Sequence, residues 1–75
     1  FNNQTVIPVV VPQSSRVRID IFNSSGARID TIIDEELSVG YYEIPFNANR
    51  LSSGVYFYRL ATNSEVKFEK MVLLK

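Results

Sequence analysis

The stretch RVRIDIF, residues 16–22, decides the fold class of this 75-residue chain. Its charged and apolar side chains alternate, so that Val17, Ile19 and Ile21 fall on one side of an extended backbone and the charged residues on the other. A period of two is typical of a β-strand with one face against a core and the other in water. Such a strand needs further strands to cover its apolar face.

Two further segments are also predicted to be strands, and each contains a proline. These segments are Thr5–Val11 and Tyr41–Phe46. The residues expected to face the core are Ile7, Val9 and Val11 in the first and Tyr42, Ile44 and Phe46 in the second. Because proline has no backbone N–H to donate, Pro8, Pro12 and Pro45 indicate that both segments are edge strands.

Between the strand at 16–22 and the strand at 41–46, the sequence predicts a turn, a weaker strand and a second turn. Asn-Ser-Ser-Gly at 23–26 favours a chain reversal, because Asn and Gly tolerate positive φ. A strand is expected over 28–33, with an unclear phase at Ile32 and Ile33 and an uncertain end. The three acids at 34–36 are expected in a solvated loop, and Leu-Ser-Val-Gly at 37–40 in a turn.

The C-terminal third predicts a loop followed by a hairpin. The loop is expected over 47–54, with Leu51 closing the open end of the core and Gly54 at positive φ or in close backbone contact. Val55–Leu60 is apolar on both faces for most of its length, which predicts a central strand covered on both sides. After a turn at 62–64, a last strand is expected over 65–74, with Val72 and Leu74 in the core.

Six or seven short strands and no helical period predict an all-β fold, an immunoglobulin-like antiparallel β-sandwich. A closed small barrel is the structural alternative. The length fits a single domain spanning residues 1–75. The chain begins at Phe1 without a secretory signal sequence, so it is expected to be a fragment of a longer protein.

Composition excludes several classes of function. Eight basic residues balance eight acidic ones, which argues against nucleic acid or an anionic membrane as a partner. No apolar run approaches the roughly 20 residues of a transmembrane helix. The chain has no cysteine and no histidine, so disulfides, thiolate nucleophiles and the commonest metal ligand are all absent.

The remaining polar residues do not form a catalytic, cofactor-binding or metal-binding pattern. The acids at 34–36 lack the spacing of an EF-hand loop, and the serine pairs at 14–15, 24–25 and 52–53 have turn contexts without a nearby base. We therefore expect no catalytic residues, no cofactor and no metal, and the chain is not expected to be an enzyme.

Two surface hypotheses have a competing structural explanation. Tyr41, Tyr42, Tyr56 and Tyr58 could stack on carbohydrate, but their phase favours packing in or beside the core. A basic stripe could form from Arg16, Arg18, Arg28, Lys67 and Lys70. Cross-strand ion pairs with Asp20, Glu65 and Glu69 are the better explanation.

Several motifs occur in an order that resembles a known family. They are Phe-Asn at 1–2 before a strand that ends at Pro12, Ile-Phe-Asn-Ser-Ser-Gly at 21–26, Leu-Ser-Val-Gly at 37–40, LSSGVYFYRL at 51–60 and KMVLLK at 70–75. Over almost its whole length the chain resembles the type A C-terminal sorting domain of the type IX secretion system, found in Bacteroidetes. It departs from the family pattern at Asn3 and Ala27. The immunoglobulin-like domain of flagellar hook-capping proteins is similar in its Gly-Val-Tyr strand.

The resemblance implies a C-terminal β-sandwich that directs an N-terminal cargo domain of the same chain out of a Gram-negative bacterium. Its partners would be the outer-membrane translocon and a sortase-like peptidase that attaches the cargo to surface lipopolysaccharide. Such a protein is secreted or displayed at the cell surface after passing through the periplasm. The candidate translocon-recognition residues are Gly54, Val55, Tyr56, Lys70, Met71, Val72, Leu73, Leu74 and Lys75.

Lys70–Lys75, a short apolar strand with a cation at each end, could also accept a receptor strand at a sheet edge. The alternative function is a structural or carbohydrate-binding immunoglobulin-like accessory module of a secreted enzyme or adhesin.

Overall fold

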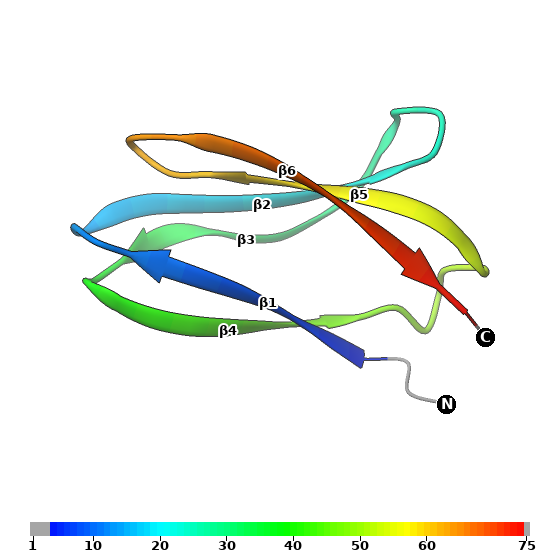
Figure 1. Cartoon of the computed structure of the whole chain (residues 1–75), viewed down its shortest axis with the longest axis horizontal. Helices are drawn as coiled ribbons and strands as arrows, with labels where there is room; N and C mark the ends of the chain where they lie inside the picture. The colour runs from blue at the N-terminus through cyan, green and yellow to red at the C-terminus, as the bar shows by residue number, and fades with distance from the viewer. Residues whose placement is uncertain (1–3, 75) are drawn as a thin grey trace.

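The computed structural model of the chain describes residues 4–74 and contains six strands (Figure 1). They are β1 (Gln4–Val11), β2 (Ser15–Asn23), β3 (Arg28–Leu37), β4 (Gly40–Asn47), β5 (Gly54–Ala61) and β6 (Val66–Leu73). All pairings are antiparallel, and the strands form a two-stranded sheet β1-β4 and a four-stranded sheet β3-β2-β5-β6. Within residues 4–74 no helix is long and apolar enough to cross a bilayer.

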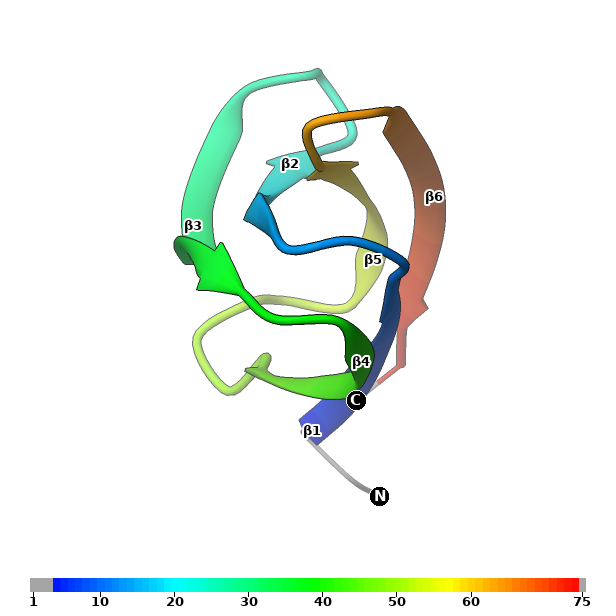
Figure 2. The ribbon, with the colours of Figure 1, turned by 90° about the vertical axis from the view of Figure 1, so that its left-hand side faces the viewer.

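The two sheets lie face to face and enclose the core between them (Figure 2). Their connectivity is immunoglobulin-like, because β1 and β4 correspond to strands B and E, and β2, β3, β5 and β6 to strands C, C′, F and G. The predicted immunoglobulin-like β-sandwich is therefore confirmed. The barrel alternative is wrong, since the described strands form two separate ladders with open edges.

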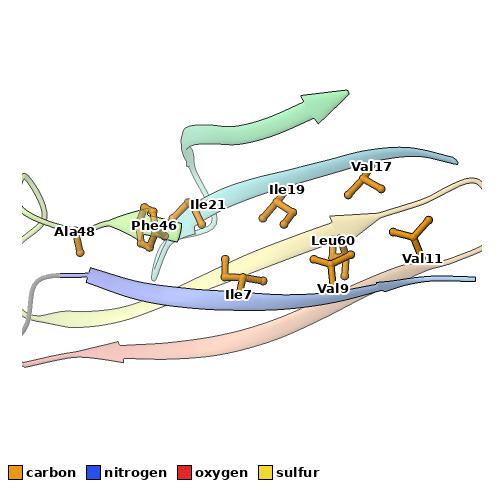
Figure 3. Close-up of a cluster of buried hydrophobic side chains, with 9 residues drawn as sticks. All are labelled: Ile7, Val9, Val11, Val17, Ile19, Ile21, Phe46, Ala48 and Leu60. Carbon is orange, nitrogen blue, oxygen red and sulfur yellow. The ribbon is translucent and has the colours of Figure 1, made fainter. Parts of the chain in front are cut away.

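The core consists mainly of the alternating residues of β1 and β2. Ile7, Val9 and Val11 extend from β1 toward Val17, Ile19 and Ile21 of β2, and all six are at most 2% exposed (Figure 3). Phe46, Ala48 and Leu60 complete the buried cluster, and Leu51 packs against it as predicted. Each such aliphatic side chain contributes about 1.5–3 kcal/mol through its removal from water.

The turn between β2 and β3 forms as predicted, through bonds to one asparagine. The Asn23 side-chain oxygen accepts hydrogen bonds from the backbone N–H groups of Ser25 and Ala27, both at 3.0 Å. Gly26 has φ 90°, a conformation that L-residues with a side chain rarely adopt. Gly54 also has positive φ, 155°, as expected. The close contact offered as its other explanation is absent, because a Cβ there would meet only Tyr56, at 4.0 Å.

The acids at 34–36 lie in β3 and not in a loop, which corrects the prediction. Across the ladder, Glu36 is opposite Arg16 and Asp34 is opposite Arg18, so opposite charges pair between the strands. The register shifts after Ile19, which leaves Ile32 as the extra residue of a β-bulge. Both Ile32 and Ile33 can therefore pack against the core, which explains their unclear phase in the sequence.

Two predictions about the C-terminal hairpin are wrong. β5 is central in its sheet, but its outer face is not covered, and Val55 is 36% exposed. Val72 and Leu74 are 57% and 75% exposed, whereas Met71 and Leu73 pack against the core. The reason is that the two strands of the opposite sheet cover only the inner face, which the odd-numbered residues of β6 share with Tyr56.

Candidate functional site

The two blocks predicted to carry recognition lie side by side at one end of the β5–β6 hairpin (Figure 1). The pairing places Gly54 opposite Leu73, Val55 opposite Val72 and Tyr56 opposite Met71. Leu74 follows directly after the strand, and Lys75 lies outside the described residues. Residues 15 to 19 positions apart in the sequence thus form one contiguous surface, because antiparallel strands meet in register.

The predicted residues divide into an inner and an outer set. Tyr56 is 7% exposed, and its hydroxyl donates a 2.9 Å hydrogen bond to the Ser52 carbonyl, which ties the loop before β5 to the core. Met71 and Leu73 pack on the same inner side. Tyr56, Met71 and Leu73 therefore hold the hairpin in place, and a partner cannot reach them as it can the outer set.

The outer set belongs to a larger apolar surface that the sequence reasoning missed. We call it the hairpin face, and it consists of Val55, Phe57, Val66, Phe68 and Val72. Val66, Phe68 and Val72 are 52%, 62% and 57% exposed, while Phe57 is half-buried. Lys70 lies opposite Phe57 on this face and adds a cation. The sequence contained a signal for this surface, because Val66, Phe68 and Val72 are separated by even numbers of residues and therefore share one face of the strand.

The free edge of β6 adjoins the hairpin face. In the described part of the chain β6 pairs with β5 alone, so one side of the strand has no backbone partner. Peptide partners commonly dock at such an edge by adding a strand, with main-chain hydrogen bonds giving affinity and alternate side chains giving specificity. The end of the hairpin therefore offers both a backbone edge and an apolar face.

The basic stripe does not form, because β2 and β6 are not neighbours, and the arginines of β2 form ion pairs with aspartates. The Arg16 guanidinium donates a 2.9 Å hydrogen bond to Asp34, and this bond lowers the pKa of Asp34. Arg18 donates to both oxygens of Asp20 at 3.1 Å. Lys67 lies 3.9 Å from Glu69 on the same strand. The predicted cross-strand pairing is confirmed for Asp20, which lies 4.0 Å from Arg28 of β3. Asp34 is a partner that was not predicted, and the Lys67–Glu69 pair lies within one strand.

The tyrosines do not form a shared stacking platform. Tyr56 is buried, Tyr42 donates a 2.8 Å hydrogen bond to the Ser38 carbonyl, and Tyr58 is half-buried. Burial raises the pKa of Tyr58, with a smaller contribution from the charge of Glu69. Tyr41 has an exposed side chain, 63% accessible on the outer face of β4. Core and rim packing therefore explains most of these rings, as favoured from their phase.

Several carboxylates and serines in the described part of the chain have structural partners. Within residues 4–74 no three side chains of His, Cys, Asp or Glu lie close enough together to hold a metal ion. Of the serines, Ser15 is buried at 6% exposure, and its hydroxyl accepts a 2.8 Å hydrogen bond from the Asn63 backbone. That bond joins the start of β2 to the β5–β6 turn, which is a structural role.

Comparison with known proteins identifies one family. A family model described as a secretion system C-terminal sorting domain matches residues 2–74, nearly the full length of the chain. No curated protein and no solved structure matches. The chain therefore belongs to the secretion system C-terminal sorting domain family, whose members direct proteins through type IX secretion across the outer membrane to the cell surface or the extracellular space.

Proposed function

We propose that this domain is read by the type IX translocon through the end of the β5–β6 hairpin, and that it carries an N-terminal cargo domain of the same protein. The proposal rests on the pairing of the two family-like blocks, Gly54–Tyr56 and Lys70–Leu73, which meet at this one place. A sorting signal is not itself catalytic, and its role requires a surface that a receptor can bind.

The outer residues of the hairpin suit this role better than the inner ones. Val55, Lys70 and Val72 leave exposed surface that the fold does not use. Contiguous exposed apolar side chains beside a charged residue are typical of protein-binding sites. We therefore assign contact with the translocon to Val55, Lys70 and Val72, and a supporting role to Tyr56, Met71 and Leu73.

An export assay tests the proposal. Residues 1–75 are fused behind a signal peptide and a fluorescent reporter in a host that has the type IX machinery. The intact fusion is expected to cross the outer membrane. The Val72→Glu variant is expected to remain folded in the periplasm, because a charge then replaces an exposed apolar contact on the hairpin face.

The matched control is Val10→Glu, which introduces the same charge at a 69% exposed valine on the outer face of β1. Its export is expected to equal that of the intact fusion. If both variants are exported normally, the hairpin face is not the recognition surface. If the intact fusion is folded but stays in the periplasm, the export role fails and a structural or carbohydrate-binding module becomes the better explanation.

A proposal on processing after export has its support in the family resemblance and not in the site geometry. We propose that a sortase-like peptidase removes the domain and attaches the cargo to surface lipopolysaccharide. Intact-mass measurement of the exported reporter tests this step. The reporter is expected to lack residues 1–75 and to remain with the cells; a released reporter that retains the whole domain would contradict it.

A further inference from the structure

The four free strand edges of the sandwich differ in how well they resist pairing with another chain. β1 and β4 carry Pro8 and Pro45, which interrupt a backbone ladder. β3 carries three consecutive acids and an irregular register with β2. β6 has no proline over residues 66–73 and pairs with β5 over eight positions without a shift. Among the described edges, that of β6 is therefore the one without a proline or an irregular register, and its protection against pairing rests on the charges of Lys67, Glu69 and Lys70.

A second copy of the chain could extend the sheet at this edge through antiparallel pairing of β6 with β6. In a two-fold arrangement one residue lies opposite itself, and its neighbours pair symmetrically around it. Because the sheet is continuous, outer-face residues face outer-face residues and inner-face residues face inner-face residues. The side chains of β6 then decide which residue lies at the centre.

The charged residues of β6 favour Phe68 as the residue at the centre of the pairing. With Phe68 at the centre, Lys67 of each copy lies opposite Glu69 of the other, and five positions pair, from residue 66 to residue 70. With Lys67, Glu69 or Lys70 at the centre, that residue would lie opposite its own like charge, which is destabilising. The register centred on Phe68 avoids these like-charge contacts and forms two opposite-charge pairs.

The one other register that pairs five positions without opposing like charges is centred on Met71. It places Glu69 opposite Leu73 and forms no opposite-charge pair, so it is the weaker alternative. In the single chain, Lys67 Nζ already lies 3.9 Å from Glu69 Oε2, with side-chain exposures of 59% and 45%. Both groups are thus accessible for a partner across the edge.

Phe68 itself favours the same register. Its ring is 62% exposed in the single chain, and in the pair it would lie beside its own copy on the outer face. Aromatic pairs directly across two strands are among the stabilising combinations in sheets. We propose that two copies of this chain associate through the free edge of β6, with Phe68 at the two-fold axis, to form a continuous eight-stranded sheet.

This inference does not depend on the export role. Val72, which the export assay changes, lies outside the five paired positions, so the two experiments are independent. Sedimentation of the 75-residue chain over a range of concentrations gives the first test. A monomer–dimer equilibrium is expected, and a chain that remains monomeric up to millimolar concentration overturns the proposal.

Single-cysteine variants test the register, because the chain contains no cysteine of its own. In Phe68→Cys the two thiols lie on directly opposite residues, whose Cα atoms are about 4.5–5.5 Å apart, within the range of a disulfide. In Lys70→Cys the two Cα atoms are separated by roughly 13 Å along the strands, too far for a disulfide. Mild oxidation is therefore expected to cross-link Phe68→Cys at least tenfold faster.

Val10→Cys is the control for exposure, since Val10 is 69% exposed on the other sheet, and it is expected to cross-link as slowly as Lys70→Cys. The reduced variants should unfold at the same urea concentration as the unmodified chain. Faster cross-linking at residue 70 or residue 10 than at residue 68 overturns the proposed register.

Charge reversal gives a second, non-covalent test. Lys67→Glu is expected to raise the dimer dissociation constant about tenfold, because each Glu69 then faces a like charge. The double variant Lys67→Glu with Glu69→Lys restores opposite-charge pairs and is expected to recover the original dissociation constant. If the double variant associates as weakly as the single one, residues 67 and 69 do not pair across the interface and the proposal is wrong.

Discussion

The burial of Asp20 could not be predicted from the sequence pattern of its own strand, β2. Asp20 lies on the polar face of β2, yet it is 4% exposed. Thr31 donates a 2.6 Å hydrogen bond to it, Arg18 donates two at 3.1 Å, and Arg28 and Arg59 lie 4.0 and 3.9 Å away. These groups come from β2, β3 and β5, so one carboxylate links three neighbouring strands.

The protonation of Asp20 follows from opposing effects. Burial raises its pKa, but the hydrogen bonds from Thr31 and Arg18 and the charges of Arg18 and Arg28 together outweigh burial. The pKa of Asp20 in the folded chain is therefore lower than in the unfolded chain. Its contribution to stability is present above the unfolded pKa of about 3.9 and is lost as the pH falls through the folded value.

The first prediction concerns Asp20→Asn. This change is expected to lower the free energy of unfolding at pH 7 by about 1–3 kcal/mol, because Thr31 and the surrounding arginines lose the buried charged acceptor that they share. Urea denaturation at pH 7 and at pH 3 measures it, and the difference between variant and parent should shrink at pH 3. Asp34→Asn, at an exposed ion pair, is the control and should have a smaller effect. A larger loss for Asp34→Asn would contradict the assignment.

At the scale of elements, β6 is a strand whose two faces have different roles. Met71 and Leu73 contact the core, whereas Val66, Phe68 and Val72 face outward. Over residues 71–74 the sequence does not show this division, because all four residues are apolar. The pairing of Tyr56 with Met71 decides it, since Tyr56 belongs to the inner face of β5.

The second prediction compares neighbouring residues of β6. Leu73→Ala is expected to lower the free energy of unfolding by about 2 kcal/mol through lost core contacts. Val72→Ala is expected to stay within about 1 kcal/mol of the parent, because its side chain is more than half exposed. Urea denaturation of both variants gives the comparison. An equal or greater loss for Val72→Ala would show that the face of β6 is assigned wrongly.

At the scale of the whole molecule, both sheets depend on one core. The β1-β4 sheet has only two strands, and a two-stranded sheet is marginally stable at best on its own. Its inner residues pack against β2 and β5, so it is stabilised by the four-stranded sheet. Unfolding of one sheet should therefore expose the core of the other.

The third prediction is that the domain unfolds in one cooperative step. The chain has no tryptophan, so its intrinsic fluorescence comes mainly from tyrosine. The buried Tyr56 and the half-buried Tyr58 are expected to dominate the change in this fluorescence on unfolding, which therefore reports the core. Far-ultraviolet circular dichroism reports the strands. The two urea transitions are expected to coincide, and separated midpoints would mean that the sheets unfold independently. The same spectra should show β structure, since a helical content above about a fifth is incompatible with this fold.

Local chemistry in the sequence determined much of the fold. The alternation in β1 and β2 identified their buried residues, because neighbouring side chains of a strand point to opposite faces whatever lies beyond them. Asn23 and Gly26 identified the first turn, and Gly54 was expected at positive φ, because these preferences belong to the residue itself. The motif order also identified the sorting-domain family, which the family match confirmed.

Tertiary structure alone decided the rest, because burial depends on what lies opposite a strand. Val72 is exposed and Leu73 packed, since a sheet of two strands covers only one face of a sheet of four. The acids at 34–36 extend β3 because arginines of β2 face them, and Asp20 is buried because hydrogen-bond donors and positive charges from three strands surround it. The two segments predicted to carry recognition form one surface for the same reason: pairing between strands, which no single segment contains, brings Val55 and Val72 side by side.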